Sequence, residues 1–236
     1  RGRPCRLHAP AAGAQLPGVI ASLVGCLLVA VLAGLGTWQV QRMHWKAGFL
    51  HQIEAMIVAE PVALPSVQDP ETDRYRPVKV AGQFTGAVIE VLSGKAGVGA
   101  GVRVIEAFVT SDGRRVLIDR GFLPEDARTT PRSGAATTVV GNLHWPRDAD
   151  AYTPPPDPKT GLWFARDVAA MAAVLNTEAT FIVAREPTGD GIEAMPVDTS
   201  SIPNDHWGYA ITWFSLAAVW AGMTGYLLWR IRQRTV

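Results

Sequence analysis

Two long apolar segments, one near each end of the chain, dominate the pattern of hydrophobic positions. Residues 16–38 and residues 207–229 contain no Asp, Glu, Lys or Arg. A helix rises about 1.5 Å per residue, so each segment is about 35 Å long as a helix, enough for a hydrocarbon core of about 30 Å. The pattern therefore predicts two membrane-spanning helices, over residues 16–40 and 206–229.

The first apolar segment also fits a second interpretation, a cleaved signal peptide. Arginines precede it, and Ala30, Ala33 and Gly34 are small enough for a cleavage region. Its apolar run is longer than the apolar region of a signal peptide. We therefore favour an uncleaved membrane anchor.

Between the spans, the chain has the pattern of a β-rich domain of roughly 165 residues that can bury its own core. Strand patterns occur in segments 75–84, 87–94, 102–110, 114–122, 136–145 and 179–186. Asp112-Gly113 is typical of the tight turn of a hairpin. These patterns predict an antiparallel sheet, with closure into a barrel as an open alternative.

Two helical patterns accompany the strands. After the first span, Trp45, Phe49, Ile53 and Met56 recur every three or four residues, which predicts that the helix continues as an amphipathic extension. A short helix over about 166–175 would place its apolar residues on one face: Val168, Met171, Ala172 and Leu175. The fold class we predict is a membrane α+β protein, with two transmembrane helices flanking a β-rich domain that contains a short helix.

Basic residues near the ends of the spans predict their orientation. On one side lie Arg1, Arg3, Arg6, Arg230, Arg232 and Arg234, and on the other only Arg42 and Lys46. Basic flanks stay in the cytoplasm. We therefore expect residues 1–15 and 230–236 in the cytoplasm, and residues 41–205 in the periplasm of a bacterial inner membrane. In a mitochondrion, the domain would face the intermembrane space.

Composition leaves little room for catalysis. Cys5 precedes the first span and Cys26 lies inside it, so the exported domain has no cysteine for a disulfide, for a nucleophile or for binding copper. Its histidines form no HExxH motif, and there is no Gly-x-Ser-x-Gly. Arg120 could clamp an anion, but we favour a structural ion pair. We therefore expect that the protein is not an enzyme and does not bind nucleic acid. We expect it to lie in a lipid bilayer.

Motifs in order along most of the chain resemble the surfeit locus protein 1 family of cytochrome c oxidase assembly factors. They are LGTWQVQRMHWKAGFL, YRPVKVAGQF, VLIDRGFLP, GNLHWP, LWFARDVAAMAA and NDHWGYAITWF. The first contains the family's Gly, Trp-Gln, Arg and Lys at Gly36, Trp38, Gln39, Arg42 and Lys46. The chain departs from the family at Asp205, where an amide is common, and at Trp207-Gly208.

The first and last motifs lie at the same membrane surface, since one closes the first span and the other opens the second. On helices, Trp38, Arg42 and Lys46 share a face with Gln39, and His206, Tyr209, Ala210 and Trp213 form one stripe. Small residues could bring the spans close at Ala21/Gly25, Ala30/Gly34, Ala218/Gly222 and Ala221/Gly225. An imidazole, aromatic walls and two cations suit a haem. An ordinary aromatic belt with snorkelling cations explains most of these residues equally well.

In the family, the histidine at the position of His206 is implicated in binding haem a. The resemblance therefore implies that His206 is an axial ligand of the haem iron, and our own inference adds Arg42 and Lys46 as partners of the haem propionates. It further implies assembly of the haem–copper oxidase as the function, with oxidase subunit I and haem A synthase as partners. A haem-independent scaffold or accessory subunit, and more distantly a membrane-anchored hydrolase, are the alternatives.

Overall fold

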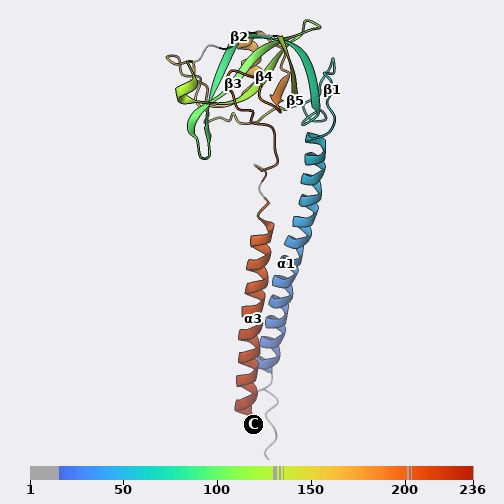
Figure 1. Cartoon of the computed structure of the whole chain (residues 1–236). Helices are drawn as coiled ribbons and strands as arrows, with labels where there is room; N and C mark the ends of the chain where they lie inside the picture. Colours follow the sequence, from blue (N-terminus) through green and yellow to red (C-terminus); the bar gives the residue numbers. More distant parts are fainter. Residues whose placement is uncertain are drawn as a thin grey trace, which may run out of the picture. The chain divides into compact units, whose positions relative to one another are not determined.

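The computed structural model of the chain describes residues 16–129, 132, 134, 136–200, 202 and 204–235. The tail predicted over residues 1–15 lies outside this range. The chain divides into two compact units. One contains helix α1 up to Leu50 together with helix α3, and the other comprises residues 51–201. Two apolar helices thus flank a β-rich domain with a helix, and Figure 1 labels their elements.

Helices α1 (Leu16–Ile57) and α3 (His206–Thr235) are both long and apolar enough to cross a membrane. Helix α1 runs without a break to Ile57, which confirms the predicted extension beyond the apolar segment. On the predicted apolar face of this extension, Ile53 is buried, whereas Trp45, Phe49 and Met56 are exposed. Pro61 follows the helix end, and a proline disfavours continuation of a helix.

The last turn of α1, which belongs to the unit of residues 51–201, is hydrogen-bonded to the β-rich part of that unit. The Ile57 carbonyl accepts hydrogen bonds from Asn142 Nδ2, at 2.9 Å, and from Arg185 Nη2. Ile57 is itself buried. A carbonyl at a helix C-terminus has no partner within the helix, so these two donors satisfy it and fix where the helix ends.

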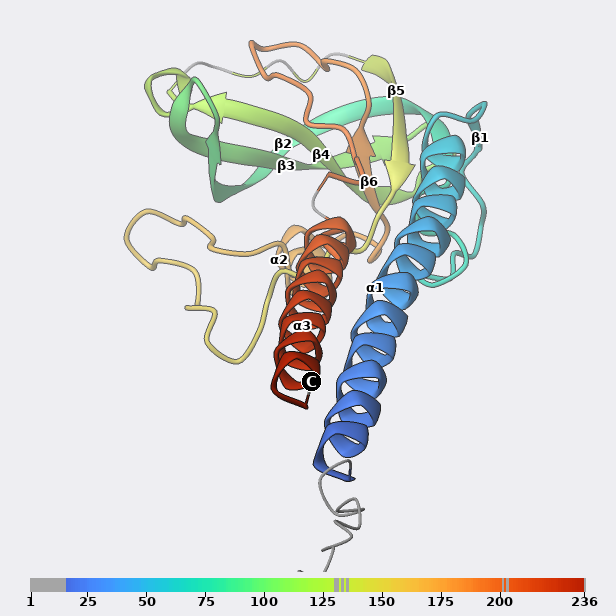
Figure 2. The same cartoon turned by 90° about the horizontal axis from the view of Figure 1, so that it is seen from below.

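Within the first unit, α1 and α3 lie side by side (Figures 1 and 2). A Cβ atom added at Gly36 would come within 2.8 Å of the Phe214 ring, and one at Gly25 within 2.3 Å of Thr224 Cγ2. On α3, Ala210 and Ala217 are buried. Small residues therefore do allow the two helices to approach closely.

The positions of that contact differ from most of the predicted pairs. A Cβ atom added at Gly34, Gly222 or Gly225 would meet nothing within 4 Å, so only Gly25 of the predicted glycines lies at the contact. Gly34 is nine residues from Gly25, which is about two and a half turns and so the opposite side of the helix. Gly36 is eleven residues away, about three turns, and returns to the same side.

The second unit is built on one six-stranded sheet in the order β1-β2-β3-β4-β6-β5. The strands are β1 (Val62–Ala63), β2 (Pro77–Lys95), β3 (Gly99–Thr110), β4 (Arg115–Pro124), β5 (Ala136–Leu143) and β6 (Phe181–Ala184). A 3-10 turn, η1 (Glu125–Ala127), follows β4. Strand β5 also pairs with β2, so the hydrogen-bonded order returns from the last strand to the second. The predicted hairpin between β3 and β4 is confirmed, with Gly113 at a φ of 86°.

Strand β2 replaces two strands that the pattern predicts separately. Its first part, from Pro77 to Gln83, pairs with β5, and the part from Gly82 onward pairs with β3. The register against β3 shifts between Phe84 and Val88, and Gly86 in this stretch has a φ of 79°. An irregularity at a glycine bends a strand without ending it. This bend lets one strand serve two partners.

The sheet is not purely antiparallel, which corrects the prediction. Strand β6 pairs parallel to β4 and antiparallel to β5, and the short β1 pairs parallel to β2. Parallel neighbours need a long connection. The chain between β4 and β6 supplies one, because it includes β5 and helix α2 (Val168–Leu175).

Helix α2 packs as its sequence predicts. Asp167 caps it by accepting a hydrogen bond from the Ala170 N–H, and all four residues of the predicted apolar face are buried: Val168, Met171, Ala172 and Leu175. They join one apolar cluster with residues of the sheet that include Ile105, Leu117 and Phe181. Neighbouring residues on the same strands, such as Ile118 and Ile182, enter a second cluster. Alternation along the strands thus fills two cores.

Candidate functional site

The ring of His206 contacts helix α1. Its Nδ1 lies 2.9 Å from Gln39 Oε1. An amide oxygen can only accept, so Nδ1 donates this hydrogen bond, and in the corresponding neutral tautomer the lone pair lies on Nε2. A histidine at a helix start can also bond a neighbouring carboxylate, here that of Asp205, or water, but the structure pairs His206 with Gln39. An imidazole whose Nδ1 donates a hydrogen bond can bind a metal through Nε2.

Gln39 is the residue that the sequence interpretation did not assign to the site. It lies three residues from Gly36, and on a helix these two positions share a face. Gly36 packs against Phe214. The close approach of the helices at Gly36 therefore places Gln39 within reach of His206. The sequence places Gln39 on the same helix face as Trp38, Arg42 and Lys46. Its pairing with His206 could not be predicted, because it depends on the register between two helices that are far apart in the sequence.

The other residues predicted for the site on the two helices differ in how exposed their side chains are. Trp213 is half-buried, whereas Trp38 and Tyr209 are 54% and 59% exposed. The structure therefore does not enclose the two exposed rings together with His206. They remain accessible to lipid, to a ligand or to a partner protein, and their assignment to a haem site stays a prediction.

The two cations differ in their surroundings. The Arg42 guanidinium carbon lies 4.5 Å from the centroid of the Trp45 ring, and that ring stacks on Phe49 with 6.3 Å between centroids. Arg42 is exposed and Lys46 is half-buried. A guanidinium that rests on an aromatic face keeps its charge and loses conformational freedom. Arg42 can therefore present a preordered positive charge to an anionic group.

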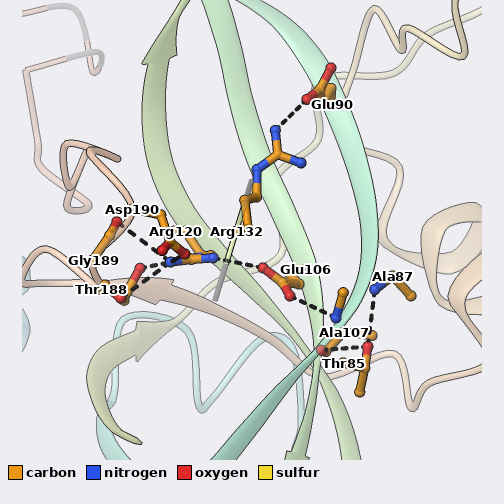
Figure 3. Close-up of polar contacts among 11 residues, drawn as sticks. Thr85, Ala87, Glu90, Glu106, Ala107, Arg120, Arg132, Thr188, Gly189 and Asp190 are labelled. Carbon is orange, nitrogen blue, oxygen red and sulfur yellow. Dashed lines mark hydrogen bonds and ion pairs between the residues drawn. The ribbon is translucent and has the colours of Figure 1, made fainter. Parts of the chain in front are cut away.

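Arg120 forms a buried ion-pair network, which confirms the structural interpretation of this residue. Figure 3 shows its guanidinium between Glu106 on one side and Asp190 with Thr188 on the other. Nη1 lies 2.8 Å from Glu106 Oε2, and Nη2 lies 2.7 Å from Asp190 Oδ2. Nε donates to Thr188 Oγ1 at 2.8 Å, and the guanidinium covers the Phe84 ring at 4.3 Å. Arg120 and Glu106 have side chains only 1% exposed, so neither is available to a ligand.

His144 is a titratable group whose surroundings the sequence did not predict. Its ring stacks on Tyr75 with 5.5 Å between centroids, and its Nδ1 is buried without a hydrogen-bond partner among the described residues. Burial, together with the charges of Arg166 and Arg74, lowers the pKa of His144 to about 4. His144 is therefore neutral at pH 7. His44 and His51, in contrast, are exposed.

The low pKa of His144 predicts a loss of stability in mild acid. Between pH 6.5 and about 4 the unfolded chain binds a proton that the folded chain does not, so stability falls as the pH falls through this window, by about 3 kcal/mol at most. Urea titrations of the full chain in detergent at pH 7 and pH 4.5 measure the effect. His144→Gln should flatten the slope and His51→Gln should not. An unchanged slope in His144→Gln would contradict the prediction.

Comparison with known proteins covers both units of this chain. The SURF1 family matches residues 26–218. Surfeit locus protein 1 of Rattus norvegicus is 31% identical over 226 residues, which is 85% of this chain and 72% of the rat protein. The human protein of the same name is 31% identical over 219 residues, covering 81% and 72% of the two chains. A SURF1-like protein of the bacterium Rickettsia felis is 26% identical over 208 residues, 83% of this chain and 91% of the relative. The chain belongs to the SURF1 family.

Proposed function

We propose that this protein assists assembly of the haem–copper cytochrome c oxidase, with His206 as an axial ligand for haem a. The observation that carries the proposal is the contact between His206 Nδ1 and Gln39 Oε1, at 2.9 Å. It holds the ring in the tautomer whose Nε2 can bind iron, and a hydrogen bond of this kind to the second ring nitrogen commonly orients a metal-binding histidine. His206 therefore fits the role of an iron ligand in two respects, the type of its donor atom and the orientation of its ring.

Other residues of the two helices have roles within this proposal. Trp213 lies seven residues after His206, about two turns deeper on α3, and is half-buried, so it could form an aromatic wall with Trp38 and Tyr209. Arg42 and Lys46 would pair with the haem propionates, because cations bind carboxylates through charge-assisted hydrogen bonds. When bound, the haem supplies an iron with an open position for the imidazole. The protein itself needs only to bind the haem and to release it, and no reaction step is required of the protein.

We further infer the topology that this role needs. The excess of arginines beside both chain ends favours cytoplasmic termini, with residues 41–205 in the periplasm, or in the intermembrane space in mitochondria. The return of the sheet order from β5 to β2 supports a barrel-like exported domain. In this arrangement oxidase subunit I and haem A synthase would meet the protein within the bilayer and at its outer surface.

A haem spectrum of the purified full chain tests the proposal. The protein is purified in detergent from cells that make haem a, and we expect a Soret band that is lost in His206→Ala. In Gln39→Ala, where the ring is no longer oriented, we expect haem affinity to fall by about 10- to 100-fold. His44→Ala is the matched control, because His44 lies on the exposed surface of α1, and it should keep the band.

The same purification separates haem binding from a scaffold function. The exposed aromatic rings of Trp38 and Tyr209 would also suit a protein partner. A preparation without a Soret band that still copurifies oxidase subunits would overturn the haem proposal in favour of a haem-independent scaffold. Hydrolytic activity of the full chain would favour the more distant alternative, an anchored hydrolase.

A further inference from the structure

A cavity of about 480 Å³ in the unit of residues 51–201 has a lining rich in hydrogen-bond donors and positive charge. Its polar lining includes Tyr75, Lys95, Arg103, His144, Arg166 and Ser200. Cavities of this size commonly hold small ligands with a few convergent polar groups. None of these residues belongs to α1 or α3, so the cavity shares no residue with the haem site proposed above.

Each cation of this cavity forms an ion pair with a carboxylate that does not line the cavity. Arg103 Nε and Nη2 lie 2.9 Å and 2.8 Å from Asp119 Oδ2, and Nη2 also donates to the Met195 carbonyl at 3.1 Å. Asp119 is fully buried, so it contributes no accessible acceptor to the cavity. The Arg103 guanidinium is therefore fixed in position while its charge stays close to the cavity.

Two further cations complete the positive side. Arg166 Nε lies 2.6 Å from Asp148 Oδ2, and its Nη1 lies 3.6 Å from Asp119 Oδ2. Lys95 forms an ion pair with Glu193. The side chains of Arg166 and Lys95 are only 19% and 29% exposed. Charges that are partly shielded from water attract a counter-ion more strongly than exposed ones.

The carboxylates paired with the three cations, Asp119, Asp148 and Glu193, are not among the residues that line the cavity. Asp198 is the carboxylate that lines it, and this residue is exposed. Asp198 already accepts hydrogen bonds from the N–H and the hydroxyl of Ser200, at 3.0 Å and 2.7 Å. The accessible surface therefore presents cations and donors, with the one lining carboxylate engaged at the exposed side.

His144 adds a polar group that nothing in the described structure satisfies. Its Nδ1 is buried and has no hydrogen-bond partner. The ring also lines the cavity, with Tyr75 stacked against it. Burial favours the neutral form of this ring, and the positive charges of Arg166 and Arg74 add to that effect. A bound anion would oppose those charges, so the ring should report on occupancy of the cavity.

We propose that this cavity binds a small oxyanion, a phosphate or carboxylate group, between Lys95, Arg103 and Arg166. Guanidinium and ammonium groups bind such groups through charge-assisted hydrogen bonds, and here Asp119 and Asp148 order the two guanidinium groups in advance. The ligand is either a soluble anion or the headgroup of an anionic phospholipid, which share this chemistry.

Magnetic resonance of the full chain with ¹³C-labelled histidine tests the site. The protein in detergent at pH 7 is titrated with sodium phosphate at constant ionic strength, and the His144 signal is assigned with His144→Gln. In a second arm, the protein is placed in nanodiscs of phosphatidylglycerol or of phosphatidylcholine, without free phosphate. We expect a saturable shift of the His144 signal with phosphate, or a shift in phosphatidylglycerol alone if the ligand is a headgroup.

Charge variants distinguish the site from general attraction. The double variant Lys95→Gln, Arg166→Gln should weaken the response at least tenfold, and Lys95→Gln alone severalfold. The matched control removes two positive charges elsewhere, Arg114→Gln with Arg147→Gln, and should respond as the parent protein does. No saturable shift in either arm, or equal weakening in the control, would overturn the proposal. The haem spectrum of the His206 variants is independent of both results.

Discussion

Replacing Arg120 with methionine is expected to lower the free energy of unfolding of residues 51–201 by about 3–5 kcal/mol. The methionine keeps much of the side-chain volume but removes the charge between Glu106 and Asp190. Glu106 would then be a buried carboxylate that keeps the hydrogen bond from the Gly86 N–H, at 2.9 Å, but has lost its counter-ion. An ion left without its counter-ion in a protein interior costs far more than a surface pair contributes.

A second buried change shows that the lost partner, and not the lost volume, causes this effect. Arg120→Met combined with Glu106→Gln should recover part of the loss, because the uncompensated charge is gone. Arg147→Met is the control, since the Arg147 and Glu71 side chains are 73% and 70% exposed, and it should cost about 1 kcal/mol or less. Urea titration of the full chain in detergent, followed by near-ultraviolet circular dichroism, measures each variant. A loss below about 1 kcal/mol in Arg120→Met would contradict this account.

Alanine at position 121 is expected to be almost as damaging, by about 2–5 kcal/mol. Gly121 has a φ of 117°, and a Cβ atom there would lie 2.0 Å from the Glu193 carbonyl oxygen. The opposing backbone cannot move away freely, because Phe122 and Glu193 exchange hydrogen bonds of 2.8 Å and 2.9 Å. The residue before it, Arg120, is the extra residue of a bulge in β4 against β3. Glycine therefore permits both the close approach and the bulge that aims Arg120.

Gly113 provides a control for the backbone contribution alone. It also has a positive φ, of 86°, but nothing lies within 4 Å of a Cβ at this position. Gly113→Ala should therefore cost only the strained backbone, about 1–2 kcal/mol. The difference between the two variants, measured by the same urea titration, isolates the contact with Glu193. Equal losses would mean that the contact relaxes without cost.

Features that depend on neighbours in the sequence were predictable. The buried face of α2 follows from a period of 3.6 residues, and all four of its residues are buried as expected. The turn at Asp112-Gly113 follows from the backbone freedom of glycine, and β3 and β4 pair across it. In both cases a few adjacent residues determine the local structure, so no tertiary information was needed.

Features that depend on pairing between distant segments were not predictable in the same way. Each predicted strand pattern within β2 was sound, but its continuity through Gly86 depends on β3 and β5 pairing with different parts of it. The parallel pairing of β6 with β4 likewise has no local signal. Residues on a strand reveal that it pairs, and not with which neighbour.

The two candidate sites show the same contrast. His206 was recognised as a candidate from one motif, whereas its partner Gln39 lies 167 residues away and depends on how two helices pack. The oxyanion cavity draws Lys95, Arg103 and Arg166 from separate elements, and each would look like an ordinary surface cation in the sequence. Their convergence, and the carboxylates that hold them from behind, arise only when the sheet is complete.

The position of β6 between β4 and β5 has a consequence for synthesis of the chain. As the polypeptide emerges, β2, β3 and β4 are made well before residues 181–184, and until then the edge of β4 at Leu117 and Ile118 has no strand to pair with. An unpaired apolar edge readily joins another chain. Release of a chain that stops short of residue 181 would therefore leave an aggregation-prone sheet. Folding of this domain can finish only when almost the whole segment before α3 has been synthesised.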